Sequence, residues 1–271
     1  MINMNTTIDI KQLKAIQLDI MDHFHKWCIE NDITYFITAG TLIGALRHNG
    51  YIPWDDDIDV VMLRPDYEKM LKLFPKDGRY RLYSIERDPS CIYAYAKVYD
   101  FDTLMIEGNE KAHPKIGVNI DIFPLDSVTD NYEDGKKLKK QLQLLNDILG
   151  VKQLDKANRG LVKNVTVAVL RAISSFFPYS WLVKQIIRGS KKYVENTDSR
   201  YIVNAVIHAK GEREILEREW FKDTVELEFE GRKYLAPIGA DQYMRRLFGN
   251  YMQLPPEDKR VSHHRFKAYY K

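Results

Sequence analysis

The chain has 271 residues, of which 45% are hydrophobic and 29% charged, a composition typical of a globular protein. Its 41 basic and 38 acidic residues give a formal net charge of +3, too small for a dedicated nucleic-acid binder. The two cysteines exclude a disulfide-stapled scaffold and a cysteine-based zinc site, and we expect neither a signal peptide nor a membrane span.

Helices and short strands are predicted to alternate over the first half of the chain. Apolar residues recur every three or four positions over residues 10–28, which predicts an amphipathic helix with Asp9 and Gln12 as its capping box. A small-residue turn at 39–41 is expected to open a short helix that Gly50 and Pro53 end. We also expect a helix over 65–73 and strands over 33–38, 57–62, 91–98 and 118–123.

The second half is predicted to be mainly helical. A helical pattern runs over residues 132–193, and short strands at 225–229 and 232–235 flank a Glu230-Gly231 hairpin turn. Residues 161–187 are apolar but interrupted by basic residues, and Pro178 favours two helices over one. This segment suits either a buried helix pair or an amphipathic surface on an anionic membrane or a lipid-linked acceptor.

A cluster of carboxylates precedes an apolar strand. Asp55, Asp57 and Asp59 would share one face if the chain is extended, with the Cα atoms of neighbouring members roughly 6.5–7 Å apart. A hard cation such as Mg²⁺ would relieve their repulsion; a solvated acidic turn is the alternative. A calcium-binding loop does not fit, because the positions for its glycine and glutamate hold Val60 and Asp66.

Asp121 is a further acid within an apolar run, over residues 118–123. A buried carboxylate needs a cation or hydrogen-bond donors nearby. It either caps the turn after its strand or faces Asp57 and Asp59 across neighbouring strands, and the sequence leaves both open.

These motifs together resemble the LicD/fukutin family of the nucleotidyltransferase superfamily. The resemblance covers most of the chain in order and is weakest over about 130–225. It is carried by Ala39-Gly40-Thr41-Leu42-Ile43-Gly44-Ala45-Leu46-Arg47-His48, Gly50-Tyr51-Ile52-Pro53-Trp54-Asp55-Asp56-Asp57-Ile58-Asp59, Lys97-Val98-Tyr99-Asp100, Asn119-Ile120-Asp121-Ile122-Phe123-Pro124-Leu125-Asp126, Leu247-Phe248-Gly249-Asn250-Tyr251, Leu254-Pro255-Pro256 and residues 260–264.

The resemblance implies an α/β fold, with a polymerase-β-type mixed sheet, flanking helices and an additional helical part. It implies a nucleotidyltransferase-like core at 1–130, a helical insertion at 131–224 that is membrane- or acceptor-facing, and a C-terminal segment at 225–271 returning to the core. Gly40 and Thr41 match the family's glycine turn, and Asp57, Asp59 and Asp121 match its three acids. Gly40 and Asp57 are 17 positions apart, more than in the compact superfamily pattern.

The implied activity is transfer of phosphocholine, or of a related alditol or glycerol phosphate, from a CDP-linked donor such as CDP-choline or CDP-ribitol. The acceptor would be a hydroxyl of a cell-surface glycan or lipid-linked glycan, in lipopolysaccharide, teichoic acid or capsule, and CMP would be released. We expect no nucleic-acid partner, and a cytoplasmic protein with peripheral contact at the inner face of the membrane.

Magnesium, with manganese as the alternative, would be held by Asp57, Asp59 and Asp121, with Asp55 as a further ligand or a neighbour of the ligands. An ordinary aspartate, with a pKa of about 3.9, is a poor base for an alcohol, so Asp121 is expected to orient the acceptor.

Further side chains are candidates for substrate binding. Gly40 and Thr41 would present backbone N–H groups to phosphate, and Arg47 and Lys97 are candidate phosphate contacts. Trp54 could stack on cytosine or choline or simply pack its loop. His263 and His264 end the pattern, and on an extended chain one of the two would face the site.

Two other functions remain open from the sequence. An Asp57-Ile58-Asp59 motif would also suit a metal-dependent glycosyltransferase that uses a nucleotide sugar, and an acidic loop could belong to a binding module that is not an enzyme. Asp121 and the Gly40-Thr41 turn favour phosphotransfer, because a sugar transferase needs neither in that order.

Overall fold

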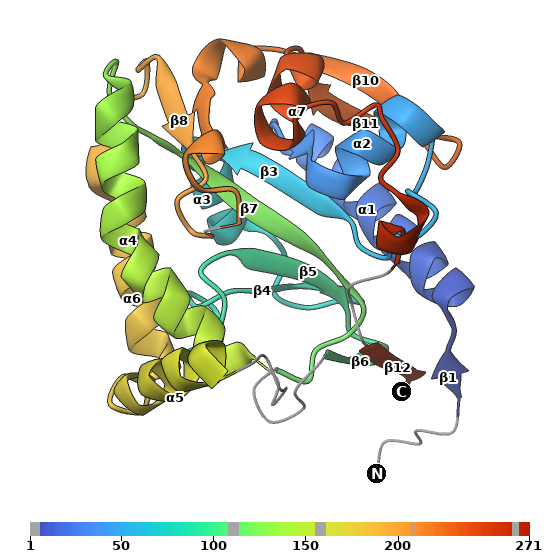
Figure 1. The fold of residues 1–271 in the computed structure, drawn as a ribbon. Coiled ribbons are helices and arrows are strands. Elements are labelled where there is room, and N and C mark those ends of the chain that lie inside the picture. Colours follow the sequence, from blue (N-terminus) through green and yellow to red (C-terminus); the bar gives the residue numbers. More distant parts are fainter. Residues whose placement is uncertain (1–5, 108–113, 155–160, 208, 262–265) are drawn as a thin grey trace.

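The computed structural model describes residues 6–107, 114–154, 161–207, 209–261 and 266–271 (Figure 1). The helices are α1 Ile10–Glu30, α2 Ala39–His48, α3 Arg64–Leu73, α4 Tyr132–Gln153, α5 Leu161–Ser175, α6 Tyr179–Ser190 and α7 Ala240–Phe248. The strands are β1 Thr7–Ile8, β2 Phe36–Ile37, β3 Asp59–Leu63, β4 Tyr80–Tyr83, β5 Ala96–Asp100, β6 Thr103–Glu107, β7 Asn119–Ser127, β8 Tyr201–Val203, β9 Ile215–Glu217, β10 Thr224–Phe229, β11 Arg232–Pro237 and β12 Phe266–Tyr270.

A mixed sheet in the order β2-β3-β7-β5-β4 forms the centre of the molecule. β3 and β7 run parallel, and the other neighbours along this path are antiparallel. The far end of β7 pairs with β8, which pairs with β9, so that β7 extends beyond the other central strands. The α/β class is therefore confirmed, and the polymerase-β-type topology remains what the family resemblance implies.

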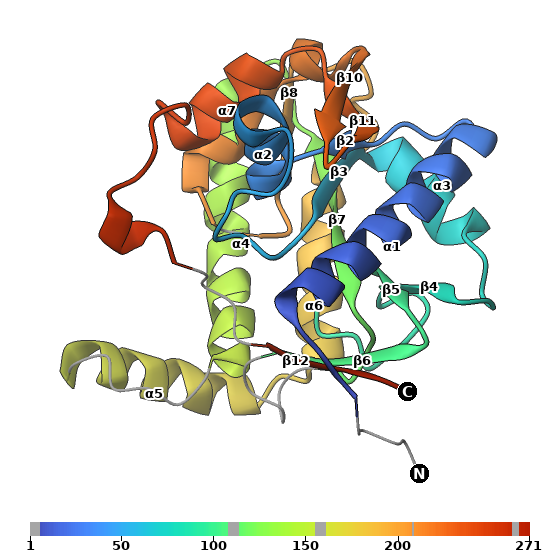
Figure 2. The same ribbon diagram turned by 90° about the vertical axis from the view of Figure 1, so that its right-hand side faces the viewer.

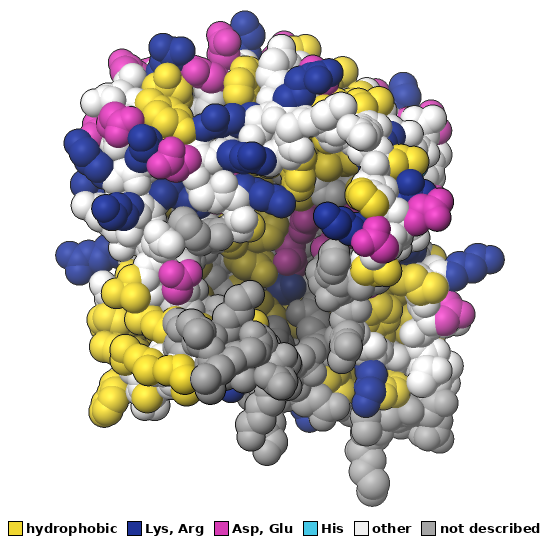
Figure 3. All heavy atoms as spheres, viewed as in Figure 1, with side chains coloured by type: hydrophobic (Ala, Val, Ile, Leu, Met, Phe, Trp, Pro, Cys, Tyr) yellow, Lys and Arg dark blue, Asp and Glu magenta, His cyan; other side chains and the backbone are white. Residues whose placement is uncertain are grey.

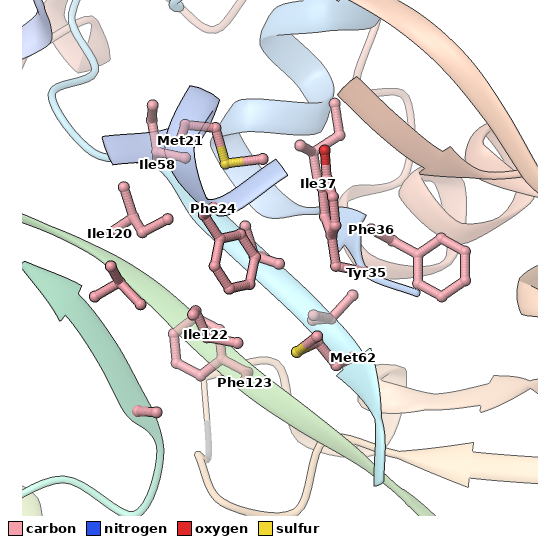
Figure 4. Packing of buried hydrophobic residues seen from close by; sticks show 14 of the residues in the cluster. Met21, Phe24, Tyr35, Phe36, Ile37, Ile58, Met62, Ile120, Ile122 and Phe123 are labelled. Carbon is pink, nitrogen blue, oxygen red and sulfur yellow. The ribbon is translucent and has the colours of Figure 1, made fainter. Parts of the chain in front are cut away.

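Helix α1 lies across one face of this sheet (Figure 2). The Asp9 side chain accepts a hydrogen bond from the Gln12 backbone and the Gln12 side chain from the Asp9 backbone, which confirms the predicted capping box. Met21 and Phe24 of α1 point toward the apolar side chains of β7 and the entrance of β3 (Figure 4). The apolar side chains that recur along the helix therefore form the face that packs against the core.

The segment after residue 130 forms three packed helices. Pro178 stands at the N-cap of α6, immediately before its first residue, so the predicted break between two helices is confirmed. Leu182, Val183 and Ile186 of α6 are fully buried within the same apolar cluster as the central strands. None of the helices in the described ranges is long and apolar enough to cross a bilayer.

The C-terminal part comes back to the first half of the chain. The predicted hairpin is present as β10 and β11, with positive φ angles at Glu230 and Gly231 as a tight turn requires. Helix α7 follows, and β12 pairs with both β1 and β6. The three-part division at 130 and 224 stays a prediction, although residues from all three parts share one hydrophobic cluster.

Some expected elements differ in position. Cys91 begins no strand: it closes a hydrogen-bonded turn with Asp88, and the buried residues after it lead into β5 only at Ala96. The residues before β5 are apolar because they are buried, although they do not pair in a sheet. A buried segment of this kind has the same apolar pattern as a buried strand. The strand expected over 118–123 instead continues to Ser127, because Pro124 faces Met62 in the parallel ladder without ending β7.

Candidate active site

The carboxylates of β3 and β7 are brought together by the sheet. Asp59 begins β3, and in the parallel ladder it is the direct partner of Asp121 in β7. Partners in register on neighbouring strands lie on the same face, with strands roughly 4.8 Å apart. The sequence had left the adjacency of these two strands open, and the structure confirms it.

Negative charge is concentrated around Asp59. Burial raises the pKa of the Asp59 carboxyl well above its ordinary value, and repulsion from Asp57, Asp121 and Asp55 raises this pKa further. Lys97 acts in the opposite direction. Four carboxylates therefore lie close enough to repel one another at the start of β3. Such an arrangement requires positive charge from the protein or from a bound cation.

Lys97 supplies part of that charge from β5. Its ammonium group lies 2.7 Å from a carboxylate oxygen of Asp121 and 3.0 Å from the side-chain oxygen of Asn119. The Lys97 side chain is only 4% exposed and also lies over the ring of Tyr93, 4.7 Å from its centroid. The predicted phosphate contact thus stands directly beside the third acid.

The start of α2 packs against the start of β3. The hydroxyl oxygen of Thr41 accepts a hydrogen bond of 2.9 Å from the backbone N–H of Asp59. A Cβ atom at Gly40 would lie 2.0 Å from an oxygen of Asp55, so the glycine makes room for this carboxylate. Thr38 at the N-cap makes no side-chain bond to the helix and instead shares one of 2.6 Å with the Tyr243 hydroxyl.

Arg47 and Trp54 lie toward the C-terminal motif. The Arg47 guanidinium donates to the backbone oxygens of Tyr251 and, at 3.5 Å, Gln253. Trp54 is half-buried against the core, and the guanidinium carbon of Arg260 lies 5.9 Å from a ring centroid of Trp54. These contacts join motifs about 200 residues apart. His263 and His264 lie outside the described residues.

Gln17 is a site residue that the sequence did not reveal. It is 2% exposed on α1, and its amide donates to the backbone oxygens of Asp56, at 3.0 Å, and Asn119, at 3.4 Å. The Tyr51 hydroxyl donates to its side-chain oxygen. Gln17 thus ties the acidic loop to β7. In the sequence, Gln17 is distinguished only by its position on the apolar face of the predicted helix. A search for apolar periodicity does not detect it, because glutamine is polar.

The donor set partly meets the needs of a hard cation. Within the described ranges, no three acidic, histidine or cysteine side chains are grouped tightly enough to hold a metal ion by themselves. Mg²⁺ is, however, usually held by one or two carboxylates together with substrate phosphates. The in-register pair of Asp59 and Asp121, with Asp57 nearby, fits that kind of site.

A space-filling view shows a hollow in this face of the molecule (Figure 3). Acidic side chains lie deep inside it, and Lys or Arg side chains lie next to them and around the rim. A concave acidic floor with basic groups beside it suits a ligand that carries phosphate and arrives with a cation.

Comparison with known proteins agrees with this geometry. Residues 32–149, which carry the glycine turn, the acidic cluster and Asp121, match the family model described as LicD/FKTN/FKRP, nucleotidyltransferase domain. Over these residues the chain is similar to the LicD family. The matched LicD domain includes every strand of the central path from β2 to β7, whereas α5, α6 and the C-terminal part lie outside it.

Similarity to one LicD protein extends over nearly the whole chain. The lipopolysaccharide cholinephosphotransferase LicD of Haemophilus influenzae is 29% identical over 270 residues, covering 97% of this chain and 98% of its own. Uncharacterized proteins of Rickettsia typhi and Rickettsia prowazekii are each 39% identical over 77 and 64 residues, about a quarter of each chain. The full-length match is thus to a transferase.

Proposed function

We propose that the protein transfers phosphocholine from a CDP-linked donor to a hydroxyl group of a cell-surface glycan and releases CMP. The observation that carries the proposal is the in-register pair of Asp59 and Asp121 beside the start of α2. The full-length similarity to a lipopolysaccharide cholinephosphotransferase supports both the transferred group and the glycan acceptor.

In this reaction the acceptor oxygen attacks the phosphorus that bears choline, and the bond from that phosphorus to the CMP oxygen breaks. The acceptor proton passes to water, and CMP leaves with the bonding electron pair. Such a transfer depends on positioning and charge stabilisation more than on covalent help from the protein. Asp121 is placed to orient the acceptor hydroxyl, and Lys97, 2.7 Å away, to compensate the charge of that carboxylate.

The remaining groups act on the donor. Asp57 and Asp59, together with Asp121, are the residues that would hold Mg²⁺, and the bound cation would neutralise charge on the donor diphosphate. The backbone N–H groups at the start of α2 suit a phosphate oxygen, because the N-terminus of a helix attracts anions. Asp55 lies against Gly40 and links this helix start to the carboxylates.

The test is Asp59→Asn compared with Asp77→Asn, an exposed acid on the loop between α3 and β4. Asp59→Asn should lower acceptor-dependent CMP release by at least about 100-fold. It should leave thermal stability in EDTA unchanged or raised, because burial and repulsion already disfavour the charged carboxylate. Asp77→Asn should behave like the unmodified protein. Full activity of Asp59→Asn would overturn the proposal.

A further inference from the structure

A cavity of about 190 Å³ lies beside Asp59. Strands β3 and β7, helix α7, the start of α2 and the segment after β8 supply its walls. Most of the lining side chains are apolar, and three aromatic rings are among them: Phe123, Tyr243 and Phe248. No role in phosphate binding accounts for so apolar a space next to a carboxylate cluster.

Two of the polar side chains of the cavity already have partners. The Tyr243 hydroxyl is already bonded to Thr38, and the Glu214 carboxylate to the buried ammonium of Lys139. The side-chain oxygen of Asn204 is buried and finds no hydrogen-bond donor among the described residues. Aromatic faces and the oxygen dipole attract an ammonium cation. The methyl groups of a quaternary ammonium lose no hydrogen bonds to water when they enter an apolar cavity, whereas the N–H groups of a primary ammonium do.

Phe248 already lies close to a cation. The ammonium of Lys210 is 4.6 Å from the centroid of its ring. Lys210 is exposed, so its charge is screened by water and its side chain is free to turn toward a phosphate. Phe248 is half-buried. A ligand cation inside the cavity would meet the same ring.

The dimensions of phosphocholine link this cavity to the carboxylates. Only two methylene groups separate its ester oxygen from its nitrogen, so the ammonium group must bind immediately beside the groups that hold the phosphate. Asp59 lines the cavity, and so do Thr38 and Ala39 at the start of α2. The cavity is therefore within reach of a phosphate held at the proposed site.

We propose that this cavity, bounded by Phe123, Tyr243 and Phe248, binds the trimethylammonium group of the donor and makes the enzyme selective for choline. This inference rests on the proposed function and adds the residues that recognise the transferred group.

The test is calorimetric binding of CDP-choline, CDP-ethanolamine and CDP, in the presence of Mg²⁺. The unmodified protein should bind CDP-choline at least about fivefold more tightly than CDP-ethanolamine, because the primary ammonium would lose hydrogen bonds to water in the apolar cavity. Phe248→Leu should remove most of this preference while leaving the affinity for CDP unchanged. Phe248→Trp should retain it. Phe176→Leu, an exposed ring on the far helical part, is the matched control.

The possible failures are distinct. An equal loss of affinity for all three compounds in Phe248→Leu would assign the cavity to the cytosine base and overturn the inference. Equal binding of CDP-choline and CDP-ethanolamine by the unmodified protein would also overturn it. Failure of the unmodified protein to bind any CDP compound would instead contradict the proposed function itself.

A second inference concerns α5, whose outer face is apolar and exposed. Val165, Val169 and Ile173 follow at intervals of four residues with exposed fractions of 56%, 53% and 41%, and Phe176 just beyond them is 82% exposed. Figure 3 shows hydrophobic side chains gathered over this corner of the molecule. An aligned apolar face of this kind marks a contact surface, unlike isolated exposed residues.

The stretch of sequence that contains α5 carries only positive charge. Residues 156–194 contain no Asp or Glu, whereas the chain as a whole carries 38 in 271 residues, about one in seven. The same stretch contains Lys156, Arg159, Lys163, Arg171, Lys184, Arg188, Lys191 and Lys192. An apolar helix face within an all-basic segment complements an anionic lipid surface.

The position of α5 connects this surface with the site. In Figure 2, α5 projects from the body toward the side from which Figure 3 looks into the acidic hollow. We infer that α5 docks on an anionic membrane surface and so brings the hollow close to a lipid-linked acceptor. The acceptor part of this inference rests on the proposed function, whereas the docking does not.

Sedimentation with vesicles tests the docking. The protein should bind phosphatidylglycerol-containing vesicles at least about tenfold more tightly than phosphatidylcholine vesicles. Val169→Asp/Ile173→Asp should abolish binding. Leu144→Asp, at an exposed position of α4, should not. Absence of binding to anionic vesicles would overturn the inference, and so would a dimer of the unmodified protein that the double variant dissociates, because a second copy would then cover this face.

Discussion

Lys97 is a buried ammonium group that depends on the acids around it. It is 4% exposed and its partner Asp121 is 21% exposed, so water compensates little if either charge is lost. The same pair is central to the proposed chemistry. At the scale of single residues, stability and activity therefore respond differently to the same substitutions.

Lys97→Met should destabilise the fold by about 3 kcal/mol, because it leaves Asp121 in a poorly solvated place without its cation. Lys97→Met/Asp121→Asn should recover at least about 1 kcal/mol of that loss while remaining inactive. Urea unfolding of the single and double variants measures both terms. If the double variant were no more stable than Lys97→Met, the ion pair would not be the source of the effect.

At this scale the sequence predicted residue types better than residue partners. The spacing of the acids and the order of the motifs made Asp57, Asp59 and Asp121 candidates, and the structure places Asp59 and Asp121 in register. The contact of Arg47 with the backbone of Tyr251 could not be predicted, because it depends on how the ends of the chain meet. The contacts of Trp54 with Arg260 and of Lys97 with Asn119 could not be predicted either, because they depend on tertiary packing.

Helix α2 borders the candidate site where β3 begins. It starts where β2 ends, and its first turn contacts both Asp55 and the backbone of Asp59. The glycines of this helix therefore leave room for the loop that carries Asp55 to pack closely against it.

Gly40→Ala should reduce activity at least about tenfold, because the new methyl group would displace the Asp55 carboxylate. Stability should change little, since the displaced atoms are the end of a side chain. Gly150→Ala in α4 is the matched control, because nothing lies within 4 Å of the added Cβ there. The control should keep full activity and gain slightly in stability. Equal activity of the two variants would contradict this role for Gly40.

Elements with strong local signals were predicted well, and those that depend on distant partners were not. The capping box of α1, the break at Pro178 and the Glu230-Gly231 turn are encoded within a few residues. Strands β8, β9 and β12 have only three to five residues each and exist through pairing with segments far along the chain. No periodicity over so short a run distinguishes a strand from a loop.

Across the whole molecule, a buried ion pair ties the central sheet to the helical part. Arg64 at the start of α3 donates to both carboxylate oxygens of Asp126 in β7, at 2.7 and 2.8 Å, and to the hydroxyl of Ser190 at the end of α6. The two charged side chains are 4% and 2% exposed. The sheet and the helices that flank the hollow are thus held in one arrangement.

Arg64→Met should cost about 3–5 kcal/mol of unfolding free energy, because Asp126 would remain buried without its partner. Arg245→Met is the matched control: its pair with Asp241 is about half exposed, so its loss should change the unfolding free energy little. Denaturant unfolding compares the two. A loss at Arg64 no larger than that at Arg245 would contradict this account of how the parts are joined.

The central claim is attack at the phosphorus that bears choline. The most direct measurement is the nucleotide released when the purified protein, Mg²⁺ and a membrane-glycan extract meet CDP-choline, CDP-ribitol, CDP-glycerol and UDP-sugars separately. We expect acceptor-dependent release of CMP from CDP-choline. Acceptor-dependent UDP from a UDP-sugar, with no CMP from any CDP donor, would mean attack at a sugar carbon and would replace phosphotransfer with glycosyl transfer.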